Sequence, residues 1–449
     1  MSDQKSTKQI LAKLQIEALN PMQESAQTAI STNDEVVLLS PTGTGKTLAF
    51  LLPIVAALDA ELAKVQAVII APSRELAIQI EQVAREMGAG FKIDLVYGGR
   101  PFSKDRMRLQ HPPAILIGTP GRISDHLRRQ TFDANHARYL VLDEFDKSLE
   151  IGFSDEMKDI LRGLPRIEKK ILTSATEGVE IPDFVRLREP AYVDFLADGV
   201  QKLQIKTITS PEKDKLETLS QALQQLGNQP GIVFLNFKDS IQRVSEYLEE
   251  VGIPHGCFYG GMEQIDRERA LIKFRNGTHQ LLLATDLAAR GIDVPDIGFI
   301  IHYHLPQQAE AFTHRNGRTA RMQREGTAYV LKWEQEELPD FIEADGDWSW
   351  STGLQSMDDN STPVRGQAKA RASKWTTLFI SGGRQDKVSK GDIAGLFFKQ
   401  GELKHGELGV IELKQDCAFV AVPRTRAKKL IAKLNNSRIK KRKVRIYEV

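Results

Sequence analysis

Residues 40–47 of this chain, Ser-Pro-Thr-Gly-Thr-Gly-Lys-Thr, constrain its fold more than any other stretch. A short apolar run, 36–39, precedes them, and an apolar run that begins a helix, 48–52, follows them. In a strand, glycine-containing loop and helix of this kind, backbone N–H groups and a helix N-terminus surround a phosphate. Gly43 and Gly45 let the backbone approach that phosphate without a Cβ in the way. The stretch therefore predicts a phosphate-binding loop.

The polar residues of this loop suit a nucleotide that carries Mg²⁺. Lys46 is placed to neutralise the β and γ phosphates, and Thr47 to offer its hydroxyl to Mg²⁺. Ser40 stands where the usual pattern has glycine, which leaves this chemistry intact. The alternative, a glycine-containing turn before a core helix, is disfavoured because strand and helix context are both present. The loop residues predicted to bind the nucleotide are Thr42, Gly43, Thr44, Gly45, Lys46 and Thr47.

Buried apolar strands alternate with helices on both sides of this loop, which predicts an α/β fold with a parallel sheet covered on both faces. Ligands of such sheets lie at the carboxyl ends of the strands. The loop, residues 143–144 and residues 174–176 all fall at such ends, so we expect them around one crevice. The predicted strands are 36–39, 65–71, 114–118, 139–142 and 170–173, with a helix over 75–87.

A second α/β block follows a polar connection at 196–204 and has no phosphate loop, which indicates a cleft between two similar blocks. Its predicted strands are 205–208, 231–235, 281–284, 299–303 and 326–331. The predicted organisation is a first domain at 1–195, a second at 204–345, a flexible linker at 346–374 and a small C-terminal domain at 375–449.

The linker region is acidic: between residues 334 and 359 there are nine Asp or Glu and no Lys or Arg. Its first part, to about Glu343, is expected to complete the second block as a helix. Residues 346–374 are rich in Ser, Asp, Gly and Gln, as flexible linkers are. Trp348 and Trp350 are expected to dock on a neighbouring surface.

The tail is basic, with 17 Lys or Arg against 7 Asp or Glu in residues 376–449, although the whole chain carries only +2. A compact basic module is typical of proteins that bind a polyanion. The alternative is a solvated basic face on an oligomerisation domain. The tail's pattern predicts a βαββαβ split fold, with strands at 378–381, 409–413, 418–422 and 443–447 and helices at 389–398 and 425–434.

Two acidic residues, Asp143 and Glu144, follow a short apolar strand. In a nucleotide site the first carboxylate holds Mg²⁺ and the second polarises an attacking water. Phosphoryl transfer also needs cations around the γ-phosphate. Segment 314–321 supplies three arginines, of which Arg318 and Arg321 fall on one helical face. They would act as arginine fingers when the two blocks close; the alternative is that they pair with surface carboxylates.

Residues 14–345 resemble a DEAD-box RNA helicase of superfamily two, because the motifs occur in family order. The resemblance implies two tandem RecA-like parallel-sheet domains. The tail resembles the small α+β RNA-recognition-motif-like domain of DbpA-type bacterial helicases. The motifs are Gln23; 40–47; 71–77; 98–99; 119–122; 143–146; 174–176; Gln264 with Arg267; 284–286 with 290–293; and 314–321.

The resemblance also implies roles for individual residues. Gln23 would read the adenine edge of ATP, and Asp286 would contact its ribose. Lys46, Asp143, Glu144, Arg318 and Arg321 would form the catalytic set, with Thr47 and Asp143 on Mg²⁺. Residues implied to couple nucleotide state to closure are Ser174, Thr176, Asp146, His314 and Arg315. Residues implied to bind the RNA backbone are Pro72, Arg74, Gly99, Thr119, Gly121 and Arg122 in the first block, and Gln264, Arg267, Thr285 and Gly291 in the second.

The chain departs from the family pattern at three places. Phe145 replaces the alanine of the name motif, so its ring must find room near residues 174–176. Asn316 and Ala320 replace isoleucine and glycine, and no aromatic residue precedes Phe50 to stack on adenine.

We therefore predict an ATP- and Mg²⁺-dependent RNA helicase that remodels structured RNA, with ribosome assembly as the pathway suggested by the tail. The two distant cysteines and the polar start of the chain, without the apolar segment of a signal peptide, favour a cytoplasmic protein. We expect no membrane partner, and we expect the helicase core to be monomeric. The alternatives are an ATP-gated RNA clamp with weak hydrolysis and a non-catalytic RNA-binding assembly factor.

Overall fold

The computed structural model describes residues 6–176, 180–197, 203–286, 297–319, 326–348 and 373–449. The chain divides into two compact units. The first comprises residues 1–201 with 290–293, and the second residues 202–289 with 294–449.

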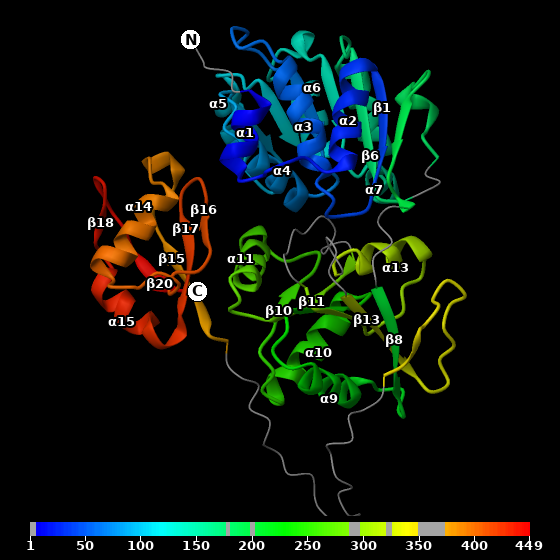
Figure 1. Cartoon of the computed structure of the whole chain (residues 1–449), viewed down its shortest axis with the longest axis vertical. Helices are drawn as coiled ribbons and strands as arrows, with labels where there is room; N and C mark the ends of the chain where they lie inside the picture. Colours follow the sequence, from blue (N-terminus) through cyan, green and yellow to red (C-terminus); the bar gives the residue numbers. More distant parts are fainter. Residues whose placement is uncertain (1–5, 177–179, 198–202, 287–296, 320–325, 349–372) are drawn as a thin grey trace, which may run out of the picture. The chain divides into compact units, whose positions relative to one another are not determined.

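The first unit is built on a seven-stranded sheet whose paired strands are all parallel, as predicted (Figure 1). Successive side chains of a strand point to opposite faces of the sheet, and here both sets are apolar, so helices cover both faces. Val36 and Leu38 join one apolar cluster and Val37 joins the other. The strand order is β3 (Ile93–Val96), β4 (Ile115–Gly118), β2 (Ala67–Ile70), β5 (Tyr139–Leu142), β6 (Lys169–Ser174), β1 (Glu35–Leu39) and β7 (Ala191–Asp194).

The helices of this unit fall into two layers that match the two clusters. α1 (Thr7–Leu14), α2 (Pro21–Thr32), α3 (Lys46–Ala57) and α4 (Arg74–Met87) place apolar side chains in the first cluster. α6 (Pro120–Arg128), α7 (Phe145–Glu150) and α8 (Ser154–Gly163) do so in the second, and α5 (Phe102–Leu109) follows β3. The predicted helix over 75–87 is confirmed.

The second unit contains a second seven-stranded sheet whose paired strands are also parallel. The prediction of a second α/β block is thereby confirmed. The helices that connect the strands of this sheet, within the described residues, are α9 (Leu216–Leu226), α10 (Lys238–Glu250), α11 (Gln264–Arg275) and α13 (Ala309–Asn316). The strand order is β10 (Gly256–Phe258), β11 (Leu281–Ala284), β9 (Gly231–Phe234), β12 (Phe299–His302), β13 (Gly326–Trp333), β8 (Leu203–Ser210) and β14 (Gly346–Asp347).

Two expectations for the acidic region are wrong. Residues 334–343 form turns and no helix. The boundary at 346 falls inside the sheet, because Gly346 and Asp347 pair with β8 and the Thr207 hydroxyl donates to the Asp347 carboxylate. Trp348 packs on Tyr329 with ring centroids 5.3 Å apart, as docking predicts, and this contact holds the strand in place. Trp350 lies outside the described residues.

The tail folds as the predicted βαββαβ unit, with an antiparallel sheet in the order β16 (Ile411–Leu413), β17 (Ala418–Pro423), β15 (Trp375–Ile380) and β20 (Ile446–Glu448). The first helix, α14 (Lys390–Gly395), continues as a π-helical turn, and α15 (Arg424–Leu434) is the second. The last predicted strand was misplaced, because Arg442–Lys443 (β19) pairs back with Arg438–Ile439 (β18) as a separate hairpin.

Candidate functional site

The phosphate loop of the first unit connects β1 to α3, as the sequence predicts. Gly43 and Gly45 have φ of 84° and 88°, values that favour glycine. The Lys46 ammonium donates to the carbonyl oxygens of Ser40 and Pro41, at 2.5 and 2.9 Å. The positive charge that would meet a phosphate is therefore held inside the loop by two carbonyl groups.

The residue predicted to read adenine, Gln23, lies beside this loop. Asn20 and Gln23 form a reciprocal cap at the start of α2. The Gln23 amide also donates to the Gly45 carbonyl at 3.3 Å, and the Asn20 amide donates to the Thr44 carbonyl at 2.9 Å. The cap of one helix thus orients the loop that begins another.

The carboxylates predicted to be catalytic lie at the end of β5, next to β6. Thr173 donates its hydroxyl to Asp143 at 2.5 Å and accepts the Glu144 backbone N–H at 3.1 Å. Burial, followed by the neighbouring Glu144 charge, raises the pKa of Asp143 to about 6. A buried carboxylate beside a second negative charge is stabilised by a bound divalent cation, and Mg²⁺ would fill that role.

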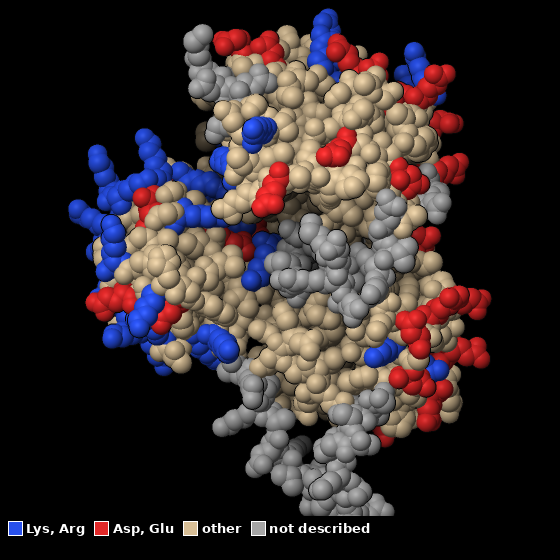
Figure 2. Space-filling model, in the orientation of Figure 1, with Lys and Arg blue, Asp and Glu red and all other residues tan. Residues whose placement is uncertain are grey.

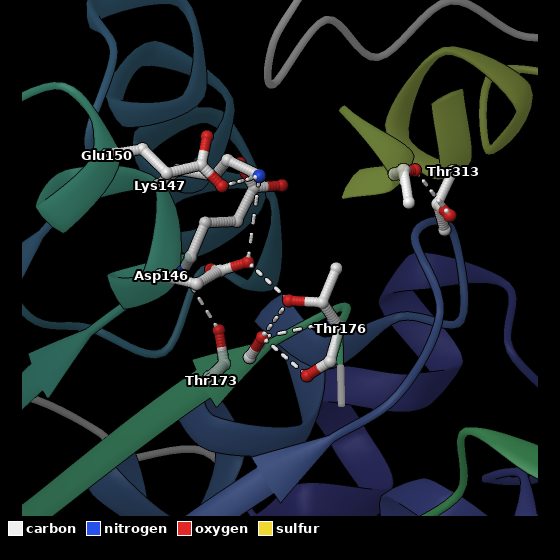
Figure 3. A network of polar contacts seen from close by, with 9 residues as sticks. Asp146, Lys147, Glu150, Thr173, Thr176 and Thr313 are labelled. Carbon is white, nitrogen blue, oxygen red and sulfur yellow. Dashed lines mark hydrogen bonds and ion pairs between the residues drawn. The ribbon is translucent and has the colours of Figure 1, made fainter. Parts of the chain in front are cut away.

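Three of the residues predicted to couple nucleotide state to closure contact one another: Ser174 and Thr176 at the end of β6, and Asp146 on α7. Figure 3 shows Asp146 beside Thr176. Thr176 donates its hydroxyl to Asp146 at 3.0 Å. The Ser174 hydroxyl accepts the Thr176 backbone N–H at 3.0 Å and lies 3.2 Å from the Thr176 hydroxyl. A continuous polar chain therefore joins Asp146 to the strand that also carries Thr173.

The predicted RNA-binding residues of the first unit follow β2, β3 and β4. A Cβ on Gly99 would lie 2.8 Å from the Arg74 guanidinium, so glycine is what lets this arginine lie over the loop. Arg122 donates to the carboxylate of Asp105, at 2.8 Å from Nε, and to the Arg100 carbonyl. Pro72 is buried in the turn before α4, and Thr119 and Gly121 lie at the start of α6.

In the second unit, the ends of β9, β11 and β12 surround Arg315, which is 1% exposed. Its guanidinium donates to both oxygens of Asp286, at 2.5 and 2.7 Å. It also donates to the Asn236 side chain at 2.7 Å and to the His304 carbonyl at 2.8 Å. Asp286, predicted to contact ribose, is thus held by Arg315, a residue predicted to act in coupling.

A buried histidine supports this arginine. His302, 0% exposed, lies 2.9 Å from the Asn316 amide oxygen. Burial, and then the Arg315 charge, lowers the pKa of His302 to about 3. A neutral imidazole can therefore pack beside Arg315 without repelling it.

The remaining predicted residues of the second unit fall into three groups. His314 and Arg318 are 9% and 6% exposed and flank the end of α13. Arg267 lies over the ring of Phe258 at 4.9 Å and shares α11 with Gln264. The Thr285 N–H donates to the Phe258 carbonyl. Gly291 and Arg321 lie outside the described residues.

Several polar residues of these sites were not predicted from the sequence. Most of them share one signal, a buried or partly buried polar side chain inside or soon after an apolar strand or on a helix, and Asn20 is the partly buried cap of α2. These residues are Asn20, Thr173, Asp105, Asn236, His302 and His304.

Three family models match the chain: DEAD/DEAH box helicase over residues 20–183, Helicase conserved C-terminal domain over 214–323, and DbpA RNA binding domain over 377–448. The chain is similar to the ATP-dependent RNA helicase DbpA of Escherichia coli (strain K12), with 31% identity over 439 residues, covering 95% of this chain and 94% of that protein. It is 28% identical to the ATP-dependent RNA helicase DbpA of Bacillus subtilis (strain 168), over 95% of this chain and 93% of that one.

Among solved structures, S. cerevisiae Dbp5 bound to RNA and ADP BeF3 matches with a TM-score of 0.66 and 27% identity, over 74% of this chain and 89% of that chain. Mss116p bound to ssRNA and AMP-PNP matches with a TM-score of 0.64 and 26% identity, over 73% and 72%. The chain therefore belongs to the DEAD-box family of ATP-dependent RNA helicases, and its residues 377–448 form a DbpA-type RNA-binding domain.

Proposed function

We propose that this enzyme hydrolyses ATP faster when RNA is bound, and uses the cycle to separate short duplexes in structured RNA. The observation that carries the proposal is the polar connection at the end of β6. Thr173 contacts the catalytic Asp143, and Thr176 contacts Asp146, so hydroxyl groups of one short segment reach both ends of the acidic motif. A movement of this segment would change both contacts together.

We assign the chemistry of hydrolysis to residues of both units. Lys46 leaves its two carbonyl partners to neutralise the β and γ phosphates, and Glu144 positions the attacking water. Arg318 and Arg321 stabilise charge on the γ-phosphate. Mg²⁺, held by Thr47 and Asp143 together with the phosphates, would withdraw charge from the phosphoryl group.

We assign nucleotide recognition to Gln23 for adenine and Asp286 for ribose, with residues 42–47 around the phosphates. Asp286 accepts two hydrogen bonds from the Arg315 guanidinium. Ribose binding would therefore compete with this ion pair or share the carboxylate with it. Because Arg315 belongs to the proposed coupling set, this contact would link nucleotide binding to the second unit.

We propose that RNA is held by backbone contacts that read no base sequence. The first unit would contribute Arg74 and Arg122 with backbone N–H groups near Gly99 and Gly121, and the second unit Gln264, Arg267, Thr285 and Gly291. Dbp5 and Mss116p, whose folds match this one, are described as bound to RNA or ssRNA.

Target choice is assigned to the basic tail. Lys and Arg side chains gather over the C-terminal domain (Figure 2). Binding of structured RNA through this domain would raise the local concentration of RNA at the two RecA-like blocks. We propose ribosomal RNA as the target, ribosome assembly as the pathway, and the cytoplasm as the location.

Among the described residues, no helix is both long and apolar enough to span a bilayer. The exposed basic residues of α15, of the following hairpin and of the connection to β20 are Arg424, Lys428, Lys429, Lys433, Arg438, Lys440, Lys441, Arg442, Lys443 and Arg445.

The test is the steady-state ATPase rate with and without total RNA, for the natural protein and for Glu144→Gln. We expect RNA to stimulate the natural protein, and the variant to lose turnover by about 10²-fold or more because the water is no longer activated. Glu144→Gln should still bind ATP and RNA. Long-lived RNA complexes with little turnover would indicate a clamp instead, and RNA affinity that ignores nucleotide would indicate a non-catalytic binder.

A further inference from the structure

Lys147, the residue directly after the acidic motif, is a buried cation that the reaction does not use. It lies on α7 and is 2% exposed, and its side chain is among the largest that are fully buried. Its ammonium group forms an ion pair with Glu150 and lies 4.0 Å from the Asp146 carboxylate (Figure 3). Burying an ammonium group costs several kcal/mol unless carboxylates compensate it. An apolar side chain of the same length could occupy this buried position without that cost, yet the protein has a lysine there.

The carboxylate next to Lys147 is the one that Thr176 contacts. Asp146 Oδ2 accepts the Thr176 hydroxyl at 3.0 Å, and the same oxygen faces the Lys147 ammonium. The side chain of Asp146 is only 4% exposed. In a site of low dielectric, a cation at this distance favours the orientation of the carboxylate that turns Oδ2 toward the ammonium. That orientation also presents Oδ2 to the Thr176 hydroxyl, which donates to it.

We infer that Lys147, anchored by Glu150, is a positioning residue that holds Asp146 ready for Thr176 and so transmits the state of the nucleotide site to RNA remodelling. The inference rests on the proposed function and adds a residue to its coupling set. Glu150 is 32% exposed at its side chain, so it can anchor the ammonium from the solvent side. The Lys147 ammonium pairs with Glu150 and faces Asp146. Lys147 contacts Glu144 through the backbone, where the Lys147 N–H donates to the Glu144 carbonyl at 3.0 Å, and a side-chain substitution leaves that bond in place. We therefore expect it to affect coupling more than the chemical step.

The test replaces Lys147 by Met, which keeps the length and removes the charge, and by Arg, which keeps the charge. Duplex separation and ATP hydrolysis are measured on the same RNA and expressed as duplexes separated per ATP. Lys147→Met should lower this ratio by about fivefold or more, the range that coupled sites show. Lys147→Arg should restore most of it. A purely structural defect would lower the folded fraction, and with it both rates, and leave the ratio unchanged.

Lys215→Met is the matched control. Lys215 is a lysine of the second unit, 6% exposed, that pairs with Glu336 and donates to the Leu331 carbonyl. Its replacement removes a buried ammonium group of the same kind outside the coupling network. It should lower stability without changing the number of duplexes separated per ATP.

A double-substitution cycle gives a second readout. If Lys147 acts through Thr176, then Lys147→Met should have little further effect on the ratio in a Thr176→Val background. Lys215→Met should behave identically in both backgrounds. An unchanged ratio in Lys147→Met, or effects of Lys147→Met and Thr176→Val that multiply, would overturn the inference while leaving the proposed function intact. A natural protein without RNA-stimulated hydrolysis would overturn both.

Discussion

The two RecA-like sheets have the same topology and differ in what their strand ends carry. Numbered along the chain within each block, the strand order is 3-4-2-5-6-1-7 in both. In the first block, strand five ends in acidic residues, strand six ends in hydroxyl residues, and strand one ends in the glycine-containing loop. In the second, strands two, four and five end in Asn236, Asp286 and His304, which together hold one arginine. One scaffold thus serves two opposite electrostatic purposes.

The difference lies in which charge is prearranged. The first block brings Asp143, Glu144 and Asp146 together around a space for cations, and the pKa of Asp143 is raised because burial and Glu144 disfavour its charge. The second block immobilises Arg315 and keeps the neighbouring His302 neutral. The first block therefore prearranges buried negative charge, whereas the second holds its buried arginine in an ion pair with Asp286. This explains why duplicated topology does not produce duplicated function.

The largest effect is expected from removing the arginine of the second block. Arg315→Met leaves the Asp286 carboxylate and the Asn236 amide without their buried partner, so the free energy of unfolding should fall by about 3–5 kcal/mol. Arg243→Met is the matched control, because Arg243 and Asp214 form an exposed pair, with side chains 63% and 47% exposed. The control should lose less than about 1 kcal/mol. Urea unfolding followed by circular dichroism measures both, and equal losses would contradict the comparison.

Loss of a buried apolar side chain from the first block should lower the free energy of unfolding by a similar amount. Phe145 is 1% exposed and belongs to the cluster that includes Met157 and Ile160. Phe145→Ala should cost about 3–5 kcal/mol of stability by opening a cavity. Phe145→Leu, which keeps most of the volume, should cost less than about 1.5 kcal/mol.

Turnover per folded molecule should be unchanged in both Phe145 variants. The ring lies in the core, and the polar contacts of Asp143 and Asp146 are made by Thr173 and Thr176. An alanine variant that keeps its stability and turns over faster would show instead that the ring slows the coupled cycle. That result would favour the clamp alternative.

Acid should weaken the second block through its buried histidines. Burial, and then the Arg315 charge, lowers the pKa of His302 to about 3, whereas the unfolded chain takes up this proton near pH 6.5. Between these values the unfolded state binds more protons, so the free energy of unfolding falls as the pH falls, by up to about 1.4 kcal/mol per pH unit. His302→Gln should flatten this slope in urea unfolding at pH 7, 6, 5 and 4. The same slope in both proteins would contradict the assignment.

The fold was largely predictable because its signals are local. Buried strands read as apolar runs, and the parallel sheet follows from their alternation with helices. The strand at 93–96 was missed because Asp94 interrupts its apolar run; that carboxylate is 4% exposed and pairs with Lys92 and Arg108. The strand at 346–347 was missed because its residues read as linker, and only pairing with β8 and the packing of Trp348 define it.

The candidate site was predictable where its residues are contiguous in the sequence. It was not predictable where residues from separate strands and helices come together only in the fold. Residues 40–47 and 143–146 are contiguous, so their chemistry could be read directly. The partners of Arg315 come from the ends of three strands, and Asp105 reaches Arg122 from another helix. Such pairs depend on tertiary packing, which no local pattern encodes.

The smallest predicted effect compares two buried serines at matching strand ends. Ser40 follows the first strand of the first block, and its hydroxyl donates to the Thr44 hydroxyl at 2.7 Å, which donates to the Pro41 carbonyl. Ser210 ends the first strand of the second block; its hydroxyl accepts from Thr218 at 2.9 Å and donates to the Glu212 carbonyl. Both are 0% exposed. Each Ser→Ala change should therefore cost about 1 kcal/mol of stability.

Only Ser40→Ala should also weaken ATP binding, by roughly two- to tenfold, because the loop loses a hydrogen bond that holds its curve before the phosphates arrive. Ser210→Ala removes a hydroxyl from a strand end without a phosphate loop, so ATP affinity should not change. Isothermal titration with a non-hydrolysable ATP analogue measures both proteins under one condition. Equal affinities would show that the loop is shaped by Gly43, Gly45 and the Lys46 contacts alone, and that the corresponding serines serve only packing in both blocks.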